Sequence, residues 1–273
     1  MIRLLVPLSL AAVAALVLGG GWLAPYDPTS TAGAPWQPPN PAHLLGTDAL
    51  GRDVWSRVLA GGGRLLTVSV AAALCASALG IAGGLVAGWS GGPLARLLTA
   101  CADFLLALPS LLLALVAAIA LPWQTAVVVA TVCGGAPLTL RVVRDAVRTI
   151  RTSGYVEAAL LRGETTASVL LREVFPAMRG LVSADLGLRL VVAIQVCAAL
   201  GVLGLGATPP APDWALMLRE NMTGVATNPW AVAAPAIALG ATTVLFALAA
   251  QLSFHEHEDR RPNRAGQEEK PHA

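Results

Sequence analysis

The chain has 273 residues, of which 56% are hydrophobic and only 12% are charged, and its formal net charge is +2. Soluble domains carry roughly 25% charged residues, so this composition excludes a water-soluble globule and indicates a protein embedded in lipid. The small net charge gives no reason to expect a nucleic-acid partner. The cysteines lack metal-ligand spacing and are predicted to be reduced packing residues: Cys75, Cys101, Cys133 and Cys197.

Six segments are apolar enough to cross a bilayer, for which a helix needs about 20 residues. They are residues 4–24, 65–88, 99–121, 123–140, 181–206 and 231–252. The first also has the positive start and apolar centre of a signal peptide, but its apolar run exceeds the roughly 7–15 residues of a signal core. We therefore predict a retained first span within residues 1–24 and five further spans within residues 65–254.

Basic residues predict the orientation of these spans. With the N-terminus in the cytoplasm, thirteen basic residues lie inside, namely Arg3, Arg96, seven arginines between 141 and 179, and four in the tail. Only Arg52, Arg57, Arg64 and Arg219 then lie in outer loops. Because positive residues concentrate on the cytoplasmic side, both termini are predicted to be cytoplasmic.

The loops outside the spans differ in character. Residues 25–64 begin with six prolines, which predict an extended extracytoplasmic loop. From Thr47 onward a short interfacial helix is expected, capped by Thr47 or Asp48. Residues 207–230 form a second outer loop, and residues 255–273 form a charged cytoplasmic tail whose composition predicts disorder.

Residues 141–180 form a charged cytoplasmic loop between two apolar segments, and a membrane protein has little reason to display such a loop unless a partner docks there. Glu157 suits the start of a helix, and Ala158 and Ala159 favour helix and permit close packing in a partner's groove. Gly163 permits a sharp turn or a very close approach, and Pro176 is expected to stop or kink the second helical piece.

This order of residues resembles the cytoplasmic coupling loop of ABC importer permeases. The segment LGTDALGRDVWSR at residues 45–57 resembles a signature of the dipeptide, oligopeptide and nickel branch, specifically of its C-type subunits. Similar residues at 88–92 and 203–230 extend the resemblance over about residues 20–250. The chain departs from that family at Val174, Phe175 and Ala177, next to the coupling proline, and at its C-terminal end.

The resemblance implies an all-α type I importer permease fold with six transmembrane helices, and a permease subunit rather than an enzyme, with no catalytic residue and no cofactor. It implies four kinds of partner: a second permease, two ATPase subunits, an extracytoplasmic binding protein and the lipid bilayer. The cargo is then a peptide, nickel or a metal–chelator complex. The sole lysine, Lys270, precedes Pro271, so the chain has no P-loop and ATP hydrolysis is expected on the partners.

The resemblance also assigns two sets of residues. The ATPase-coupling set is Tyr155, Glu157, Ala158, Ala159, Gly163 and Pro176. The extracytoplasmic motif, expected to act at the outer face, is Gly46, Thr47, Asp48, Gly51, Arg52 and Asp53.

Two patterns suggest other chemistry. The sequence Gly88-Trp89-Ser90-Gly91 fits the GxSG of intramembrane serine proteases, but no histidine lies in a span to act as the base, so a flexible turn is favoured. The tail contains His255, His257 and His272. His255 and His257 are separated by one residue, which does not place both on one helical face, so a solvated tail is favoured over a metal site.

Few polar residues lie in or near the spans. Asp185 and Arg189 are one helical turn apart and are predicted to pair, and Asp103 is assigned a structural role near a helix end. Gln195, near the middle of its span, is the candidate for lining the pathway. The alternative function is a self-sufficient secondary transporter driven by an ion gradient, although that class usually carries internal repeats and midplane ionisable residues.

Overall fold

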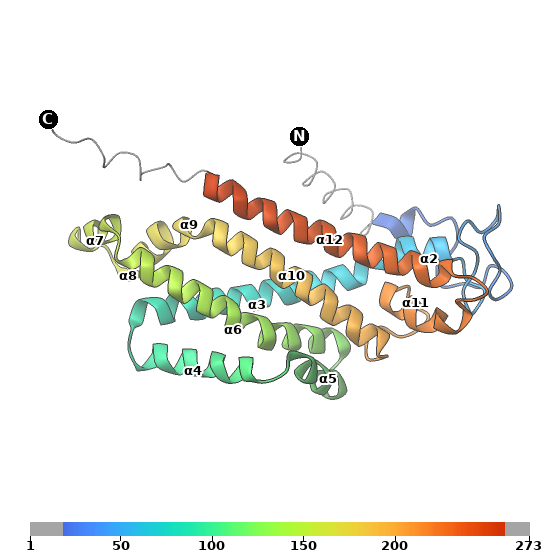
Figure 1. The fold of residues 1–273 in the computed structure, drawn as a ribbon, viewed down its shortest axis with the longest axis horizontal. Helices are drawn as coiled ribbons and strands as arrows, with labels where there is room; N and C mark the ends of the chain where they lie inside the picture. The colour runs from blue at the N-terminus through green and yellow to red at the C-terminus, as the bar shows by residue number, and fades with distance from the viewer. Residues whose placement is uncertain (1–18, 260–273) are drawn as a thin grey trace.

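The computed structural model describes residues 19–259, and within that range the chain is built from helices and loops without a β-strand. Four helices are long and apolar enough to cross a membrane: α3 (Gly62–Ser90), α6 (Trp123–Arg151), α10 (Arg179–Val202) and α12 (Trp230–Asp259). They run side by side along the long axis of the molecule (Figure 1). They confirm the second, fourth, fifth and sixth predicted spans, while most of the first, residues 4–18 of 4–24, lies outside the described range.

The third predicted span, residues 99–121, is not one straight helix. It consists of α4 (Pro93–Ala107) and α5 (Ser110–Ala120), which are bent by 88° relative to each other. The break falls at Leu108, whose backbone is extended with ψ 132°. Pro109 explains this correction, because proline disfavours helical geometry at the residue before it and lacks the N–H that a continuous helix needs.

Small residues let α3 lie directly against α6. A Cβ atom built on Gly80 or Gly84 would come within 2.4 or 2.6 Å of the Cβ atoms of Thr139 and Val143 on α6. Real Cβ atoms do not approach so closely, so glycine is required at these two positions. Close backbone approach is the usual basis of helix association in membranes, where the hydrophobic effect supplies no driving force. The two helices are therefore in direct contact at Gly80 and Gly84.

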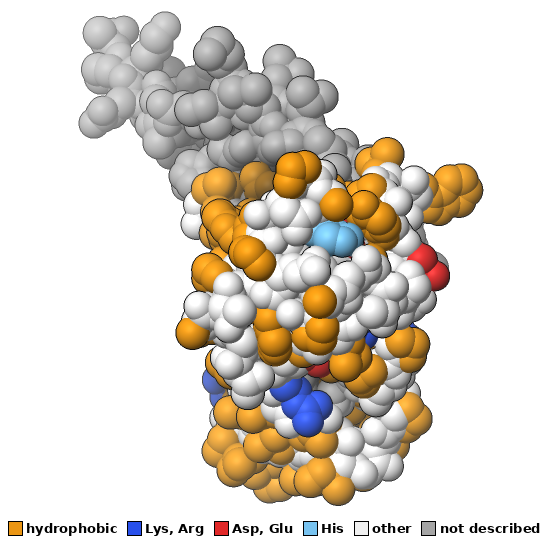
Figure 2. Space-filling view, turned by 90° about the vertical axis from the view of Figure 1, so that its right-hand side faces the viewer, with side chains coloured by type: hydrophobic (Ala, Val, Ile, Leu, Met, Phe, Trp, Pro, Cys, Tyr) orange, Lys and Arg blue, Asp and Glu red, His pale blue; other side chains and the backbone are white. Residues whose placement is uncertain are grey.

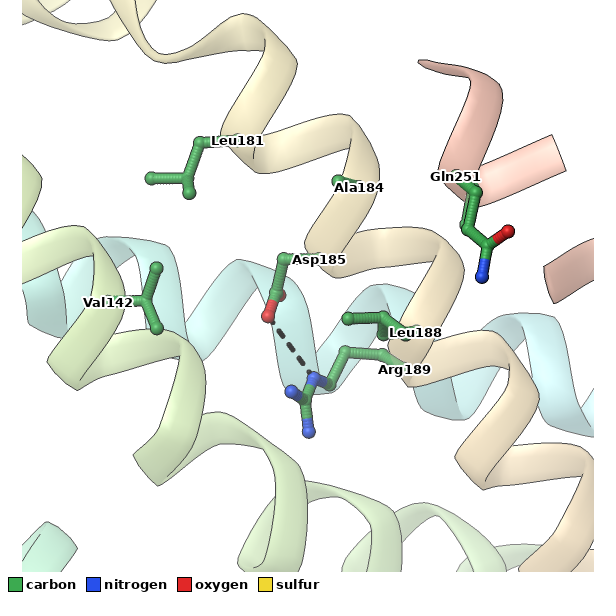
Figure 3. A pocket seen from close by; sticks show the side chains of 8 residues that line it. Val142, Leu181, Ala184, Asp185, Leu188, Arg189 and Gln251 are labelled. Atoms are coloured by element: carbon green, nitrogen blue, oxygen red, sulfur yellow. Dashed lines mark hydrogen bonds and ion pairs between the residues drawn. The ribbon is translucent and has the colours of Figure 1, made fainter. Parts of the chain in front are cut away.

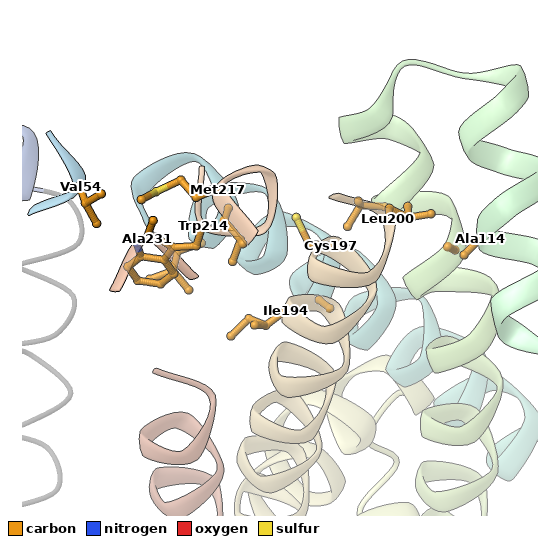
Figure 4. Packing of buried hydrophobic residues seen from close by; sticks show 14 residues of the cluster. Val54, Ala114, Ile194, Cys197, Leu200, Trp214, Met217 and Ala231 are labelled. Atoms are coloured by element: carbon orange, nitrogen blue, oxygen red, sulfur yellow. The ribbon is translucent and has the colours of Figure 1, made fainter. Parts of the chain in front are cut away.

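A buried apolar cluster fixes the end of the bundle that carries the two loops predicted to be extracytoplasmic, which we call the outer end. It joins Val54 of the short helix α2 (Val54–Ala60) to Trp214 and Met217 of α11 (Trp214–Asn221) and to Ile194 and Leu200 of α10 (Figure 4). Short 3₁₀ turns flank this region at Gly20–Trp22 and Met222–Gly224. The outer loops are thus packed onto the spans rather than projecting freely.

Helix α2 begins later than the sequence suggests. The expected start at Thr47 is wrong: α2 begins at Val54, and its cap is Asp53, which accepts a hydrogen bond from the Ser56 N–H at 2.8 Å. Gly46 and Gly51 both have a φ of +72°, so the intervening residues form a tight loop instead of a helix.

At the opposite end the chain forms a helical hairpin, which we call the inner hairpin (residues 152–178). It contains α7 (Gly154–Leu161), α8 (Thr166–Val169), a π-helical turn (Leu170–Val174) and α9 (Phe175–Ala177). It projects beyond the ends of α3 and α6 (Figure 1). The assigned loop 141–180 is therefore shorter than expected, because α6 continues to Arg151 and α10 already begins at Arg179.

Candidate functional site

The inner hairpin is held rigidly against α6. Val156, Ala159 and Val169 are fully buried and form one cluster with Val143 and Val147, which lie on the inner part of α6. Of the two predicted alanines, Ala158 is exposed but Ala159 packs inside the chain. The side chain of Ala159 is therefore used inside the chain and that of Ala158 is at the surface, and the coupling role of both residues stays a prediction.

The side of α7 that is not packed against the chain presents an apolar surface. Tyr155 is 46% exposed and Leu161 is 89% exposed, and Ala158 lies between them at helical spacing. We call Tyr155, Ala158 and Leu161 the hairpin patch. Leu161 was not among the residues predicted from the sequence. The available signal was its position at the end of a short helix, just before a glycine turn. Exposed apolar groups at the end of a rigid element are typical of a docking surface.

Gly163 shapes the turn that ends α7. Its φ is +77°, and its N–H donates to the Leu160 carbonyl at 3.0 Å, while the Glu164 N–H donates to the Ala159 carbonyl at 3.2 Å. These two bonds form a Schellman cap, which requires a left-handed residue at this position. No heavy atom of the described chain lies within 4 Å of a Cβ atom built on Gly163. The glycine is therefore needed for the turn and not for close packing within the chain.

The remaining coupling residues also have definite places. Glu157 lies in the first turn of α7 and is exposed, as expected for an acidic group near the positive end of a helix. Pro176 lies at the start of α9, and helical backbone continues past it to Ala177, so the proline itself does not end the second piece. The π-helical turn at Leu170–Val174 precedes the proline and widens the helix where the pyrrolidine ring would otherwise crowd the preceding turn.

At the outer end, four charged side chains form a buried cluster that we call the outer ion-pair network. Arg52 bonds Asp48 (Nε–Oδ2, 2.7 Å) and Glu220 (Nη2–Oε2, 2.6 Å). Arg57 contacts the same Asp48 oxygen and lies 3.1 Å from Glu220 Oε2 (Nη1). Asp48, Arg52 and Arg57 are at most 2% exposed. Breaking such a network is costly because it leaves buried charges unpaired.

The other residues of the extracytoplasmic motif are also internal. The Thr47 hydroxyl donates to the Ala34 carbonyl at 2.7 Å, and Asp53 bonds the His43 ring at 2.9 Å. Asn228 donates to the Leu45 and Thr47 carbonyls at 3.0 Å each. Arg52 and Asp53 are thus buried in a motif that joins the first outer loop to the second, and their action at the outer face stays a prediction. Figure 2 shows that the outer end carries few charged side chains at its surface.

Two buried carboxyl groups of the outer end have shifted pKa values. Burial alone would raise the pKa of Asp48, but backbone hydrogen bonds from Arg52 and Leu50 and the charges of Arg57 and Arg52 outweigh it, so this pKa is lowered. Burial raises the pKa of Asp213, although this carboxylate caps α11 by accepting from the Ala215 and Leu216 N–H groups at 3.0 Å each.

The predicted intramembrane pair is present. Arg189 Nε donates to Asp185 Oδ1 at 3.3 Å, and the Thr139 hydroxyl of α6 donates to Asp185 Oδ2 at 2.7 Å. Asp103 has the structural role expected, since it pairs with Arg141 (Oδ1–Nη2, 2.5 Å). Gln195 lies on an exposed side of α10, and its role stays a prediction.

The alternative chemistries receive no support from the described residues. The Ser90 hydroxyl donates to the Val86 carbonyl at 2.7 Å, while His43 bonds Asp53 in the outer loop. No group of three metal-ligating side chains occurs in the described part of the chain. The side chains of the tail histidines lie outside that part.

Four long spans, a bent helix pair and a projecting hairpin define a multi-pass membrane transport subunit. Residues 80–258 match the family described as "Binding-protein-dependent transport system inner membrane component". The chain belongs to this family and is a permease subunit of an ATP-driven ABC importer, which replaces the secondary-transporter alternative.

Relatives support this assignment at the level of whole chains. The chain is 33% identical to a glutathione transport system permease protein GsiD of Pectobacterium atrosepticum, over 77% of this chain and 70% of that protein. It is 35% identical to a di/tripeptide transport system permease protein DppC of Pseudomonas aeruginosa, over 85% and 78%. It is also 35% identical to a peptide transport system permease protein SapC of Escherichia coli O6:H1, over 86% and 82%.

A solved structure shares the fold. A chain of the inward-facing MetNI methionine ABC transporter superposes with a TM-score of 0.52 at 17% identity, covering 71% of this chain and 94% of that one. At this identity the likeness shows the type I importer permease fold and nothing about cargo.

Proposed function

We propose that this chain is one half of a two-permease pathway, paired with a different permease subunit, served by two ATPase subunits and loaded by an extracytoplasmic binding protein. The observation that carries the proposal is the hairpin patch: exposed apolar side chains on a hairpin that is packed rigidly onto α6. A motor that grips this hairpin would move α6, and with it α3, without first having to order a flexible loop.

The orientation belongs to the same proposal. The inner hairpin and the C-terminal end of α12 lie at one end of the bundle, and α2 and α11 lie at the other (Figure 1). The arginine-rich segment from Arg141 to Arg179 lies at the hairpin end, which supports a cytoplasmic hairpin and cytoplasmic termini. In this arrangement residues 25–64 are extracytoplasmic, residues 65–254 hold five spans and residues 255–273 form the tail.

Labelling with a membrane-impermeant thiol reagent tests the orientation. A cysteine at Asp53 would be a poor probe because that side chain is only 1% exposed. Leu50 is 56% exposed, so Leu50→Cys should react from outside intact cells whose outer layer is permeable, whereas Leu161→Cys should react only after lysis. The reverse pattern would invert the proposed topology.

Peptides are the cargo that the relatives favour. Their printed names describe glutathione, di/tripeptide and peptide transport, and all of these cargoes carry carboxylates. Nickel and metal–chelator complexes remain cargoes of the wider branch, without a residue here that favours them. ATP would be hydrolysed on the partner subunits, and Gln195, exposed in mid-span, would line the pathway between the two permeases.

The docking proposal is tested with the hairpin patch. We expect Leu161→Asp to abolish co-purification of the ATPase subunits and ATP-driven uptake while the two permeases still insert together, because a buried carboxylate without a partner weakens an interface strongly. Leu44→Asp is the matched control, since Leu44 is 63% exposed at the opposite end. Normal ATPase binding by Leu161→Asp would contradict the proposal.

A further inference from the structure

A pocket opens inside the bundle beside the Asp185–Arg189 pair. Its volume is about 310 Å³, and it lies between α6, α10 and α12. Apolar side chains form most of its wall, and polar groups come from Asp185, Arg189 and Gln251 (Figure 3). The rest of the wall includes Val142, Leu181 and Leu188. An apolar pocket with a few convergent polar groups is the usual form of a small-molecule site.

Asp185 and Arg189 differ in how many of their polar atoms have a hydrogen-bond partner. Asp185 accepts from Thr139 and from Arg189 Nε, and the Ser77 hydroxyl lies 3.5 Å away. Arg189 uses only its Nε within the described part of the chain, and its terminal nitrogens Nη1 and Nη2 have no acceptor there. The side chain is nevertheless only 8% exposed. These two terminal nitrogens are therefore open to a ligand in the pocket, and a carboxylate is the group that best matches the planar donor pair.

Glycine makes room for this guanidinium on α6. A Cβ atom built on Gly135 would lie 3.1 Å from Arg189 Cδ and 3.5 Å from Nη1. The side chain of Arg189 therefore lies against the backbone of Gly135, where a larger residue would crowd it. Asp185 holds the same side chain at Nε, so the donors are oriented before any ligand arrives.

The pocket is continuous with the exposed side of α10. Leu188 lines the pocket, and Val192 and Gln195 follow it at helical spacing on the exposed surface. Gln195 lies about 9 Å from Arg189 along the helix axis, at 1.5 Å per residue. A polar side chain in mid-span normally faces protein or a water-filled path instead of lipid, so this side of α10 is suited to the pathway.

We propose that Arg189 is a carboxylate-binding group of the translocation pathway, held in position by Asp185 and Gly135. Cargo that carries a carboxylate, such as a peptide, would form charge-assisted hydrogen bonds with Nη1 and Nη2 as it passes from the level of Gln195 toward the inner end. The proposal rests on the proposed function, because it assigns a cargo class to a pathway that this chain would line.

The first test uses a cysteine probe and is independent of cargo. Leu188→Cys is placed in the full transporter, with the four native cysteines replaced, and is reacted with a carboxylate-bearing and with a neutral methanethiosulfonate reagent. We expect Arg189→Gln to lower the ratio of the carboxylate-reagent rate to the neutral-reagent rate about threefold to tenfold, because a nearby positive charge is lost. Arg141→Gln is the matched control and should leave the ratio unchanged.

An unchanged ratio in Arg189→Gln would overturn the proposal. If that variant fails to assemble, Arg189→Lys gives the second measurement. It keeps the charge but loses the planar pair of donors, so it should retain assembly and show a ratio below that of the wild type. A wild-type ratio in Arg189→Lys would show that the planar donors play no part and would overturn their assignment to a carboxylate.

The second test separates this site from the proposed function. Uptake of dialanine and of dialanine amide is measured in the wild type and in Arg189→Gln. For each compound the uptake rate of the variant is divided by that of the wild type, which removes the preference of the binding protein. We expect dialanine uptake to fall at least about fivefold more than uptake of the amide, because only dialanine presents a terminal carboxylate. Equal losses would overturn the site. If the wild type transports neither compound, the peptide cargo is refuted, and the labelling test still decides whether Arg189 binds carboxylates.

Discussion

The outer and inner ends of the molecule each carry a short charged motif, and the two motifs are used in opposite ways. At the outer end the motif residues are buried, and their charges join residues 48–57 to Glu220 of α11. At the inner end, one side of α7 anchors the hairpin, and the other side leaves Tyr155, Glu157 and Ala158 exposed. The outer motif thus builds the fold, while the inner one presents a surface.

This difference has a mechanical meaning for a transporter. In the proposed mechanism, two outer loops that share a buried ion-pair network would move together with the ends of the spans to which they connect. An inner hairpin that is packed onto α6 would pass a displacement to that helix. The following substitutions sharpen the comparison between the two ends, in order of decreasing expected effect.

The largest effect is expected at the outer ion-pair network. Asp48→Ala should lower the free energy of unfolding by about 3–5 kcal/mol, because Arg52 and Arg57 lose their shared acceptor inside the protein. Thermal unfolding of the purified permease complex measures this loss. Asp27→Ala, at an exposed site in the same loop, should change stability little. A wild-type transition in Asp48→Ala would show that the network is not structural.

The two alanines of α7 should separate anchoring from docking. Ala159→Leu overfills a fully buried site and should destabilise the packing of the hairpin by about 1–3 kcal/mol, detected as faster proteolysis of the hairpin. Ala158→Leu, on the exposed side, should leave proteolysis unchanged and affect only binding of the ATPase. Equal proteolysis of the two variants would contradict the assignment of Ala159 to the buried side of α7 and of Ala158 to its exposed side.

A backbone effect is expected at Gly163. Gly163→Val forces a β-branched residue into a left-handed turn at about 1–2 kcal/mol, which corresponds to roughly a tenfold loss of the docking-competent hairpin. ATP-driven uptake should fall accordingly while membrane insertion stays normal. Gly154→Val is the matched control, because Gly154 is in the same hairpin, also has open space around it and lacks a positive φ. Equal uptake by both variants would refute the role of the turn.

The smallest effect concerns pH at the outer end. The pKa of Asp48 is lowered, so its contribution to stability is present above the unfolded value of 3.8 and is lost only as the pH falls through its lower folded pKa. The pKa of Asp213 is raised, so the stability that its neutral form contributes at low pH is lost as the pH rises through its folded pKa.

Replacing Asp213 isolates the second of these effects. Asp213→Asn keeps a good helix cap but removes the titrating group. It should be as stable as the wild type or slightly more stable at pH 7, and it should lose that advantage near pH 4. Unfolding temperatures at the two pH values measure the difference, and a variant that is less stable only at pH 7 would contradict it.

Several features could be predicted from the sequence because their causes are local. Runs of apolar residues predict the spans over 65–88, 123–140, 181–206 and 231–252, since the length of a crossing helix depends only on bilayer thickness. The one-turn spacing of Asp185 and Arg189 predicts their pairing. A glycine six residues after Glu157 predicts a change of chain direction.

Other features depended on contacts between distant parts of the chain. The sequence does not indicate that Glu220 meets Arg52, 168 residues away, or that Ala159 turns inward while Ala158 faces out. The pocket beside Arg189 exists because Val142 of α6, Asp185 of α10 and Gln251 of α12 converge there. Local composition determines which segments become helices in lipid, but burial of charge and the shape of a pocket depend on which helices meet, and only packing in three dimensions decides that.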